Sequence, residues 1–205
     1  MSKTSSGSNS SGRKSSVERR REIAGAALQI LAEGGLHQLT TAALAERVGL
    51  AEGTIFRHFD DKAGIISAAT ELVEQMFDQA LPAADAEPLE RLGAFVRMRL
   101  QLVELHPGIQ RIMFSDRLAT CGSAEAVERV DRLKQRAIDF MLDALREARD
   151  QGLLREDIEV DALLLMVHGT AMAAAFSVNQ LADRGIGFQA DATWSAIERL
   201  IRRPS

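Results

Sequence analysis

The segment from Thr40 to Lys62 carries hydroxyl, guanidinium, imidazole and ammonium groups, among them those of Thr54, Arg57 and His58. All of these groups donate hydrogen bonds, and the guanidinium and the ammonium are also cations. Such groups contact the phosphate oxygens and the base edges of DNA. The segment therefore predicts a surface that binds nucleic acid.

Combinations of residues for covalent catalysis are missing from the sequence. It contains no metal-ligand cluster, glycine-rich phosphate loop or Ser/His/Asp grouping, and its histidines are scattered over positions His37, His58, His106 and His168. Cys121 stands beside Gly122 and Ser123, which favours a loop and a structural role. We predict that the protein is not an enzyme and has no metal site or cofactor.

Apolar spacing indicates how the segment folds. Leu44 and Val48 lie four residues apart on one helical face, and Ile55 and Phe59 repeat that spacing. Gly49 separates the two pairs at a point where a positive φ is easily adopted. The pattern predicts two short helices around a tight turn, which is a helix-turn-helix.

The second of these helices is predicted from about Glu52 to His58 and would enter the major groove of DNA. Thr40 or Thr41 is expected to cap the first helix, and Asp60 or Asp61 the helix that follows the motif. Taken singly, Thr54 or Lys62 is better explained as a solvated helix residue, and a hydrogen-bonded packing role is the alternative for His58, but the ordered set favours DNA contact. The predicted DNA contacts are Thr41, Ala51, Glu52, Gly53, Thr54, Phe56, Arg57, His58 and Lys62.

From Arg21 to Ile66 the chain resembles the DNA-binding domain of the TetR family, the tetracycline-repressor-type regulators. The likeness rests on REIAGAALQILAEGG, the Thr40-Thr41 pair, Ala45, Gly49, the run from Gly53 to Phe56, the His58-Phe59 pair and Lys62. The resemblance implies a homodimeric, all-helical transcription regulator, usually a repressor, whose C-terminal domain binds a small molecule and forms the dimer. Phe56 departs from the family, which commonly has a tyrosine there whose hydroxyl reaches a phosphate. A phenyl ring cannot make that hydrogen bond but can contact a thymine methyl.

Composition favours helices throughout. The 205 residues are 46% hydrophobic and only 4% aromatic, without tyrosine, and alanine and leucine dominate. We predict an all-α fold of about nine helices, with a three-helix DNA-binding domain over residues 17–62 and a helical bundle for ligand binding and dimerisation over residues 63–205. Residues 1–16 are rich in serine and glycine and include three cations. They are predicted to be a disordered basic arm, and contact with the minor groove or the phosphates is the alternative.

Charge and compartment agree with this interpretation. The net charge is −4, but residues up to Ser67 carry nine Lys and Arg against seven Asp and Glu, so the DNA-binding end is the positive one. A single cysteine cannot form an internal disulfide, which fits a reducing cytosol. No secretory signal or membrane span is visible. We expect a cytoplasmic, nucleoid-associated protein.

The segment DALLLMVHGTAMAAAFSVNQLA is apolar almost all the way round and must be buried on several sides. It contains small residues that let a second backbone approach closely, namely Gly169, Ala171, Ala173, Ala174 and Ala175. Together with Trp194, Ile197, Leu200 and Ile201 it is the predicted four-helix seam of a homodimer. A monomer whose core contains this helix is the alternative.

A ligand pocket is harder to predict from sequence. Methionines and phenylalanines in the C-terminal part are explained either as core or as the lining of an apolar cavity. Arg99, Arg117 and His168 fall on or near inward helical faces and need a partner, which is either an internal salt bridge or an anionic or hydrogen-bonding ligand. The candidate ligand contacts are Met76, Phe95, Met98, Arg99, Met113, Phe114, Arg117, Phe140, Met166, His168 and Met172.

These observations predict a sequence-specific regulator, a homodimer that binds a palindromic operator in double-stranded DNA. A small apolar or amphipathic effector, unidentified from sequence, would release it by favouring wrongly spaced DNA-binding heads, with the helix that begins near Lys62 as the lever. The alternative is a ligand-independent, DNA-bound adaptor whose C-terminal bundle recruits a protein partner.

Overall fold

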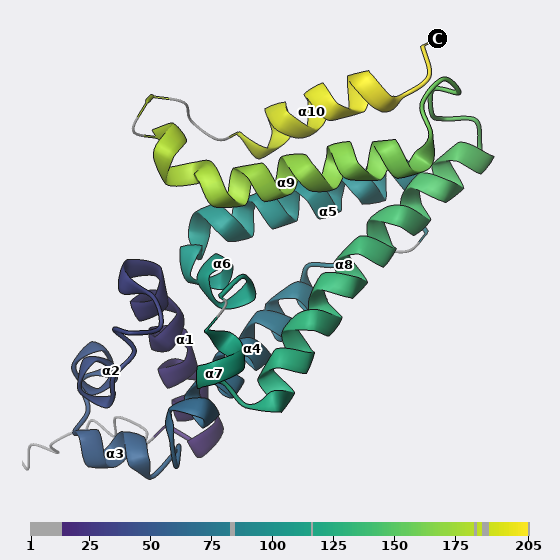
Figure 1. Cartoon of the computed structure of the whole chain (residues 1–205). Coiled ribbons are helices and arrows are strands. Elements are labelled where there is room, and N and C mark those ends of the chain that lie inside the picture. The colour runs from purple at the N-terminus through teal and green to yellow at the C-terminus, as the bar shows by residue number, and fades with distance from the viewer. Residues whose placement is uncertain (1–13, 83–84, 116, 183, 186–188, 205) are drawn as a thin grey trace, which may run out of the picture.

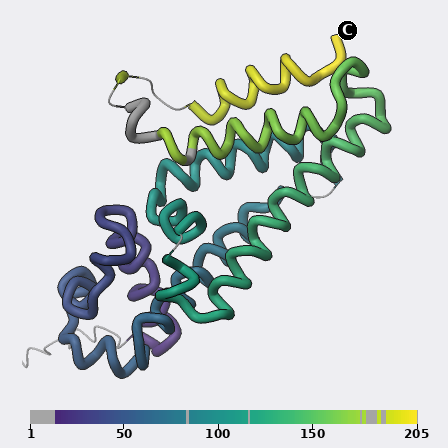
Figure 2. Tube along the Cα trace, in the orientation of Figure 1, coloured from purple at the N-terminus to yellow at the C-terminus, as the bar shows by residue number. Residues whose placement is uncertain are grey.

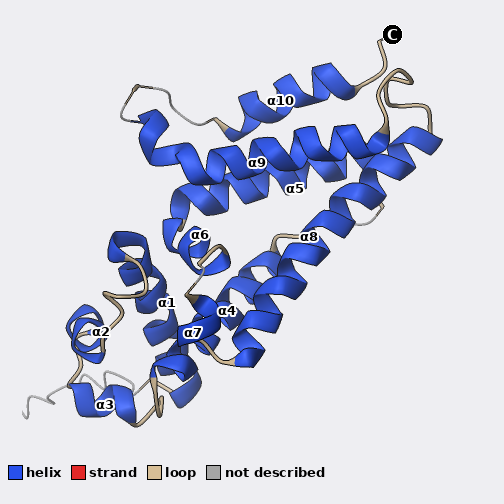
Figure 3. Ribbon diagram, viewed as in Figure 1, coloured by secondary structure: helices blue, strands red, loops and turns tan. Residues whose placement is uncertain are grey.

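The computed structural model describes residues 14–82, 85–115, 117–182, 184–185 and 189–204, with only the backbone described at residues 175 and 178–182. Within these residues the chain forms ten helices and no strand (Figure 3), which confirms the predicted all-α class. The tenth helix is a short one near Cys121, where a loop was expected. The helices are α1 (Ser16–Gly34), α2 (Thr41–Val48), α3 (Glu52–Phe56), α4 (Lys62–Gln79), α5 (Pro88–Leu105), α6 (Pro107–Met113), α7 (Leu118–Cys121), α8 (Ala124–Asp150), α9 (Val160–Ala182) and α10 (Ala190–Ile201).

Side-chain caps fix where several helices begin. Ser15 accepts from the Glu18 amide and forms a capping box at the start of α1. Of the predicted alternatives, Thr40 caps α2 and Asp61 caps α4. Ser123 caps α8 in the same way. Of the arm predicted over residues 1–16, residues 1–13 lie outside the described part of the chain.

The molecule is elongated (Figure 1), and the path of the chain is followed most easily in Figure 2. Helices α1 to α3 form one end. Helices α4 and α8 pack together and run away from it, and α5, α9 and α10 form the opposite end, with α5 packed against the other two. Helix α6 lies between the two ends and packs on α1. The N-terminal helices thereby contact the bundle through α4 and α6.

Two hydrophobic cores fill this arrangement. The first joins α1 to α4 with α6, α7 and the beginning of α8, so its members run from Ile23 to Leu133. The second joins α5, the later part of α8, α9 and α10, with Phe95 and Met141 at its centre. Phe77 packs against both cores. The core of the predicted DNA-binding unit therefore continues well beyond residue 62.

Helix α10 is held against α5 within the same chain. Gly93 on α5 makes room for the Trp194 indole, because a Cβ at this glycine would lie 2.3 Å from Nε1 of Trp194. Trp194, Ile197 and Ile201 are buried in the second core. Of the residues of the last helix predicted to form a dimer seam, Leu200 alone is exposed. In the described part of the chain, no helix is both long enough and apolar enough to cross a lipid bilayer.

Candidate DNA-binding surface and effector cavity

The turn between α2 and α3 is a tight left-handed cap. Gly49 adopts φ 68° and ψ 39°, and its N–H donates to the carbonyls at the end of α2. The Leu50 amide donates to the Ala45 carbonyl over 2.8 Å, which closes the turn. Leu44 and Ile55 are buried on the two sides of it. The predicted helix-turn-helix core is confirmed.

Most of the residues that were predicted to contact DNA lie on α3 or directly beside it. Ala51, Glu52, Gly53, Phe56 and Arg57 are exposed, whereas Thr41, Thr54 and His58 are half-buried. The guanidinium of Arg57 donates to Thr54 Oγ1 over 3.0 Å, so the two side chains form one polar unit. The helix is shorter than predicted, because it ends at Phe56 and leaves Arg57 and His58 in the turn that follows.

Arg20 on α1 fixes this turn, and sequence reasoning missed its role. Its guanidinium lies 4.2 Å from the centroid of the buried Phe59 ring and donates to the His58 carbonyl. The His58 ring is 3.5 Å from the Ser16 hydroxyl, again on α1. The sequence shows Arg20 only as one of three adjacent arginines, and nothing in that run distinguishes the one that contacts Phe59 and His58.

Lys62 has a structural partner in the free protein. Its ammonium donates to the Leu36 carbonyl over 2.6 Å and so ties the start of α4 to the loop between α1 and α2. An ammonium has three N–H donors, so this bond leaves donors for a phosphate. Lys62 therefore links α4 to the first helix pair at the edge of the surface formed by α3.

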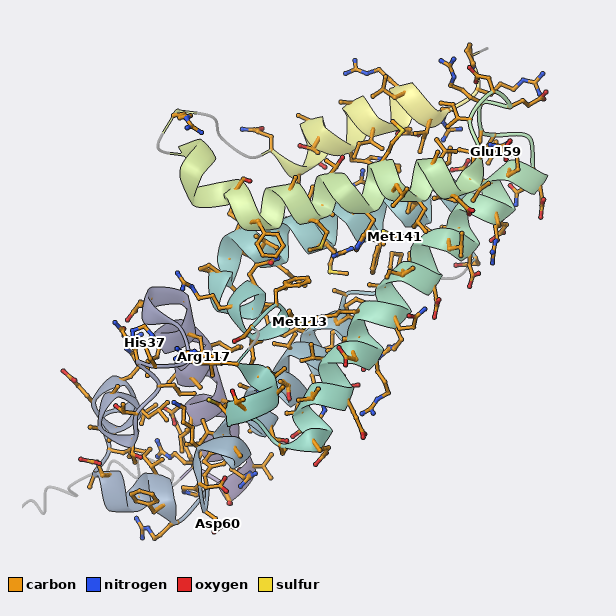
Figure 4. The ribbon with its side chains drawn as sticks, viewed as in Figure 1. His37, Asp60, Met113, Arg117, Met141 and Glu159 are labelled. Carbon is orange, nitrogen blue, oxygen red and sulfur yellow. The ribbon has the colours of Figure 1, made fainter. Side chains whose placement is uncertain are left out.

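A cavity of about 180 Å³ lies between α5, α6 and α8 and is also lined by His168 of α9. Figure 4 labels Met113 on α6, which lines the cavity, and Met141 on α8, which lies farther along toward α9. Four predicted ligand contacts meet here: Arg99, Met113, Phe114 and His168. The remaining lining residues, which the sequence did not single out, are Leu102, Val103, Ile109, Gln110, Leu133, Lys134, Ala137 and Ile138.

In the described part of the chain, the Arg99 guanidinium has no carboxylate partner. Among the described residues, no Asp or Glu oxygen lies within 4.0 Å of it. Its contacts are His168 Nδ1 at 3.3 Å and the sulfurs of Met141 and Met172 at 3.9 and 3.8 Å. Desolvation by burial lowers the pKa of Arg99 to about 10, so the group keeps its charge at neutral pH. Burial, followed by the charge of Arg99, lowers the pKa of His168.

Arg129 shows what a paired arginine looks like in the same chain. It is buried between α4 and α8 and binds Glu74 Oε2 at 3.1 Å, Glu125 Oε1 at 2.7 Å and Thr70 Oγ1 at 3.1 Å. Two carboxylates and a hydroxyl therefore satisfy this guanidinium. Arg99 differs from Arg129 because its hydrogen-bond partners among the described residues are an imidazole and two thioethers, without a carboxylate or a hydroxyl.

The other predicted ligand contacts lie outside the cavity lining. Phe95 is buried, with its ring centroid 4.5 Å from that of Phe140 and 5.9 Å from the Arg99 guanidinium. Met166 is exposed, and Arg117 is exposed at the start of α7, near α1 (Figure 4). The last three are Met98, which packs on the second core, Met172, which touches Arg99, and Met76, which lines a separate cleft beside α1.

Comparisons with known proteins agree with this architecture. Residues 23–69 match the model "Bacterial regulatory proteins, tetR family", and residues 88–191 match "Tetracyclin repressor-like, C-terminal domain". The chain is 30% identical over 141 residues to the nucleoid occlusion factor SlmA of Marinomonas sp. (strain MWYL1), covering 66% of this chain and 71% of that protein. It is 30% identical over 164 residues to SlmA of Idiomarina loihiensis, covering 77% and 83%.

Solved structures share the fold. The ketosteroid transcriptional regulator KstR2 of Mycobacterium tuberculosis superposes with a TM-score of 0.68 at 22% identity, over 91% of this chain and 96% of that one. A TetR-like transcriptional regulator from Rhodococcus sp. RHA1 gives 0.68 at 18% identity, over 92% and 96%. Because the family models cover both the helix-turn-helix end and the bundle, the chain belongs to the TetR family and is a DNA-binding regulator.

Proposed function

We propose that the protein is a homodimeric transcriptional repressor that binds a palindromic operator and is released by a small apolar or amphipathic effector. The surface formed by α3 and the turn after it is the observation on which the proposal rests, because it presents the exposed Phe56 ring and Arg57 guanidinium beside the half-buried Thr54 hydroxyl. Such a helix reads base edges in the major groove, and flanking donors bind phosphates. The predicted DNA contacts are proposed to act in this way.

An exposed apolar face on α9 supports the homodimer. Leu165, Met166 and Phe176 lie on it, with exposed fractions of 72%, 42% and 58%, and exposed Gly169 and Ala173 leave space between them. These residues recur at the spacing of one helical stripe. A second copy of the same stripe would cover it about a two-fold axis, as in an isologous dimer. Such a dimer would present two copies of α3, which matches an inverted repeat in the DNA.

Helix α6 supports coupling between the effector cavity and the DNA-binding end. The cavity is lined by Ile109, Gln110 and Met113 of this helix and by Phe114, which directly follows it. On the other side of the helix, Gly108 packs against the α1 backbone. A ligand that favours one position of α6 would move α1 with it. We propose that α6 acts together with α4, the lever predicted from sequence. A coupling free energy of about 1 to 3 kcal/mol would change operator affinity roughly 5- to 150-fold.

The experiment that tests DNA binding is genome-wide capture of the DNA bound by the protein, followed by gel-shift titration of the recovered sites. We expect an inverted repeat bound by a dimer, in the cytoplasm on the nucleoid. Genes beside the site would also suggest which effectors to screen. The absence of any DNA binding by the purified protein at low salt would refute the operator hypothesis.

A second candidate function is that of a DNA-bound adaptor that recruits a protein partner through the bundle. The observation that favours it is the similarity to proteins named nucleoid occlusion factor SlmA. The cavity between α5, α6 and α8 favours the effector hypothesis instead. A test that separates the two is whether loss of the protein changes transcription next to its binding sites, as a repressor requires, or leaves it unaltered.

A further inference from the structure

Arg99 presents an energetic problem that the chain itself does not solve. A charged group taken out of water is strongly destabilising unless an opposite charge or several hydrogen bonds compensate it. Arg129 has that compensation from two carboxylates, whereas Arg99 has one imidazole nitrogen, two thioether sulfurs and the face of the Phe95 ring at 5.9 Å. Thioethers are weak acceptors. A guanidinium in this state has donors available for an anion.

The free donors belong to a residue that lines the cavity, and most of the lining around them is apolar. Leu102, Val103, Ile109 and Met113 are part of that lining, and Lys134 is a second cation in it. An engineered cavity of about 150 Å³ binds benzene, so a cavity of about 180 Å³ accommodates an apolar body of similar or slightly greater size. The space is too small for a drug-sized ligand, for which pockets of roughly 300 Å³ or more are usual.

Gln110 adds an independent sign that a ligand belongs here. Its Oε1 is buried and has no hydrogen-bond partner among the described residues, and the side chain lies between this cavity and a second cleft that Ala32 and Phe176 line. Buried polar atoms of native proteins are nearly always paired. Two half-buried polar side chains at one cavity, Arg99 and Gln110, therefore have hydrogen-bonding capacity that no carboxylate or amide among the described residues takes up.

We propose that the cavity binds a small monocarboxylate, whose carboxylate pairs with the Arg99 guanidinium and whose apolar body lies among the side chains of α5, α6 and α8. The inference rests on the proposed function, since it names the chemical class of the effector. A carboxylate suits the site because its two oxygens match the forked N–H donors of a guanidinium. A neutral His168 that accepts from Arg99 at Nδ1 carries its own proton on Nε2, which leaves one more donor.

Isothermal titration calorimetry of the full-length protein tests the proposal with probes matched to the cavity. Benzoate and octanoate are the carboxylates, and benzamide and 1-octanol are their neutral counterparts of similar size. Since a hydrogen bond to a charged group adds appreciably to binding, we expect each carboxylate to bind about tenfold to a hundredfold more tightly than its counterpart. Equal or tighter binding of the neutral compounds, or no binding of either carboxylate at millimolar concentration, overturns the proposal.

Two substitutions sharpen the test. Arg99→Met removes the charge and keeps an apolar side chain, so the fold should persist with a melting temperature at or above that of the wild type. Carboxylate binding should be lost in Arg99→Met and kept in Arg97→Met, a control on the same helix whose guanidinium faces Asp191 at 3.6 Å and does not line the cavity. Unchanged carboxylate binding in folded Arg99→Met overturns the proposal.

Failure of this inference is distinguishable from failure of the proposed function. Calorimetry measures carboxylate binding without DNA, and a gel shift at saturating carboxylate measures release. A carboxylate that binds through Arg99 but leaves the protein–DNA complex intact supports the site and contradicts effector-driven release. Release by a neutral compound, without carboxylate binding, supports release and contradicts the carboxylate site.

Discussion

Arg57 is the cation best placed to meet DNA, because it is exposed at the end of α3 and its guanidinium is oriented by Thr54. We predict that Arg57→Ala lowers operator affinity by about 1 to 3 kcal/mol. Gel-shift titrations over a range of salt, on operators mutated at single positions, measure the loss. Relaxed preference at one base pair indicates a base contact, and a uniform loss with a smaller salt slope indicates a phosphate contact.

The matched control for Arg57→Ala is Arg132→Ala on α8. This arginine is also exposed and pairs with Glu128 at 3.6 Å, one helical turn away. Since it lies on the long helix away from α3, its removal should leave DNA affinity unchanged. Equal losses in the two variants would mean that net charge, and not the surface of α3, governs binding.

His168 predicts how stability depends on pH. Because its pKa in the folded protein is lowered, first by burial and then by the charge of Arg99, the unfolded chain binds a proton more readily. The stability associated with neutral His168 is therefore complete above the unfolded pKa of about 6.5 and is lost as the pH falls through the folded pKa. Urea unfolding at pH 7.5 and at pH values below 6.5 should show the loss, and His168→Gln should reduce it. If the unfolding free energy falls equally with decreasing pH in the wild type and in His168→Gln, the assignment to His168 is contradicted.

At the scale of helices, α6 depends on Gly108. A Cβ at this position would lie 1.8 Å from the Leu28 carbonyl oxygen, which belongs to the α1 backbone and cannot move aside independently. We predict that Gly108→Ala separates α6 from α1 and destabilises the protein by about 1 to 3 kcal/mol, the usual range for overpacking. Urea unfolding measures the stability.

Gly25→Ala on α1 is the matched control for that substitution. No atom lies within 4 Å of a Cβ built there, and the residue is inside a helix. The alanine should therefore stabilise the protein by about 0.5 to 1 kcal/mol through its helix propensity. If both substitutions have the same effect on stability, close packing of α6 on α1 is not what Gly108 provides.

Local signals in the sequence predicted most helices well, since caps and prolines act on their own neighbours. Thr40 and Asp61, each one of two predicted alternatives, cap the helices that they were expected to cap. Tertiary contacts were not predictable in this way. Arg99 and His168 are 69 residues apart, and the apolar periodicity of α10 is the same whether Trp194 packs against α5 of its own chain or against a second copy.

The cavity illustrates the same limit. Its lining was predicted from residue type, as methionines, phenylalanines and inward cations, and four of those residues line it. Leu102, Val103 and Ile109 have ordinary core identities, so nothing in the sequence distinguishes them from packing residues. Gln110 was detectable only as a polar residue within an apolar helix, and its unpaired oxygen is a property of the folded chain.

For the whole molecule, dimerisation is the prediction with the largest expected effect. Leu165→Glu places a carboxylate on the apolar stripe of α9, where a second copy would desolvate it. We predict that the dimer dissociation constant rises by more than about a hundredfold and that operator affinity falls with it. Sedimentation velocity measures the association state.

Leu105→Glu controls for the introduction of a charge on an exposed leucine. Leu105 on α5 is 71% exposed, against 72% for Leu165, but lies at the end of its helix nearest α6. The control should remain a dimer. If Leu165→Glu also sediments as a dimer, the interface lies elsewhere on the chain.

The extent of the first hydrophobic core limits the use of α1 to α3 as a DNA-binding module in fusion proteins. Because α1 to α3 share their interior with α6, α7 and the first turns of α8, a fragment cut after residue 62 would expose the side of α1 around Leu28 against which Gly108 of α6 packs. A chimera with another helical bundle would have to supply apolar side chains in place of those from α6, α7 and the start of α8. Natural exchange of heads between bundles would meet the same barrier, so in this chain specificity for DNA and the architecture behind it are expected to evolve together.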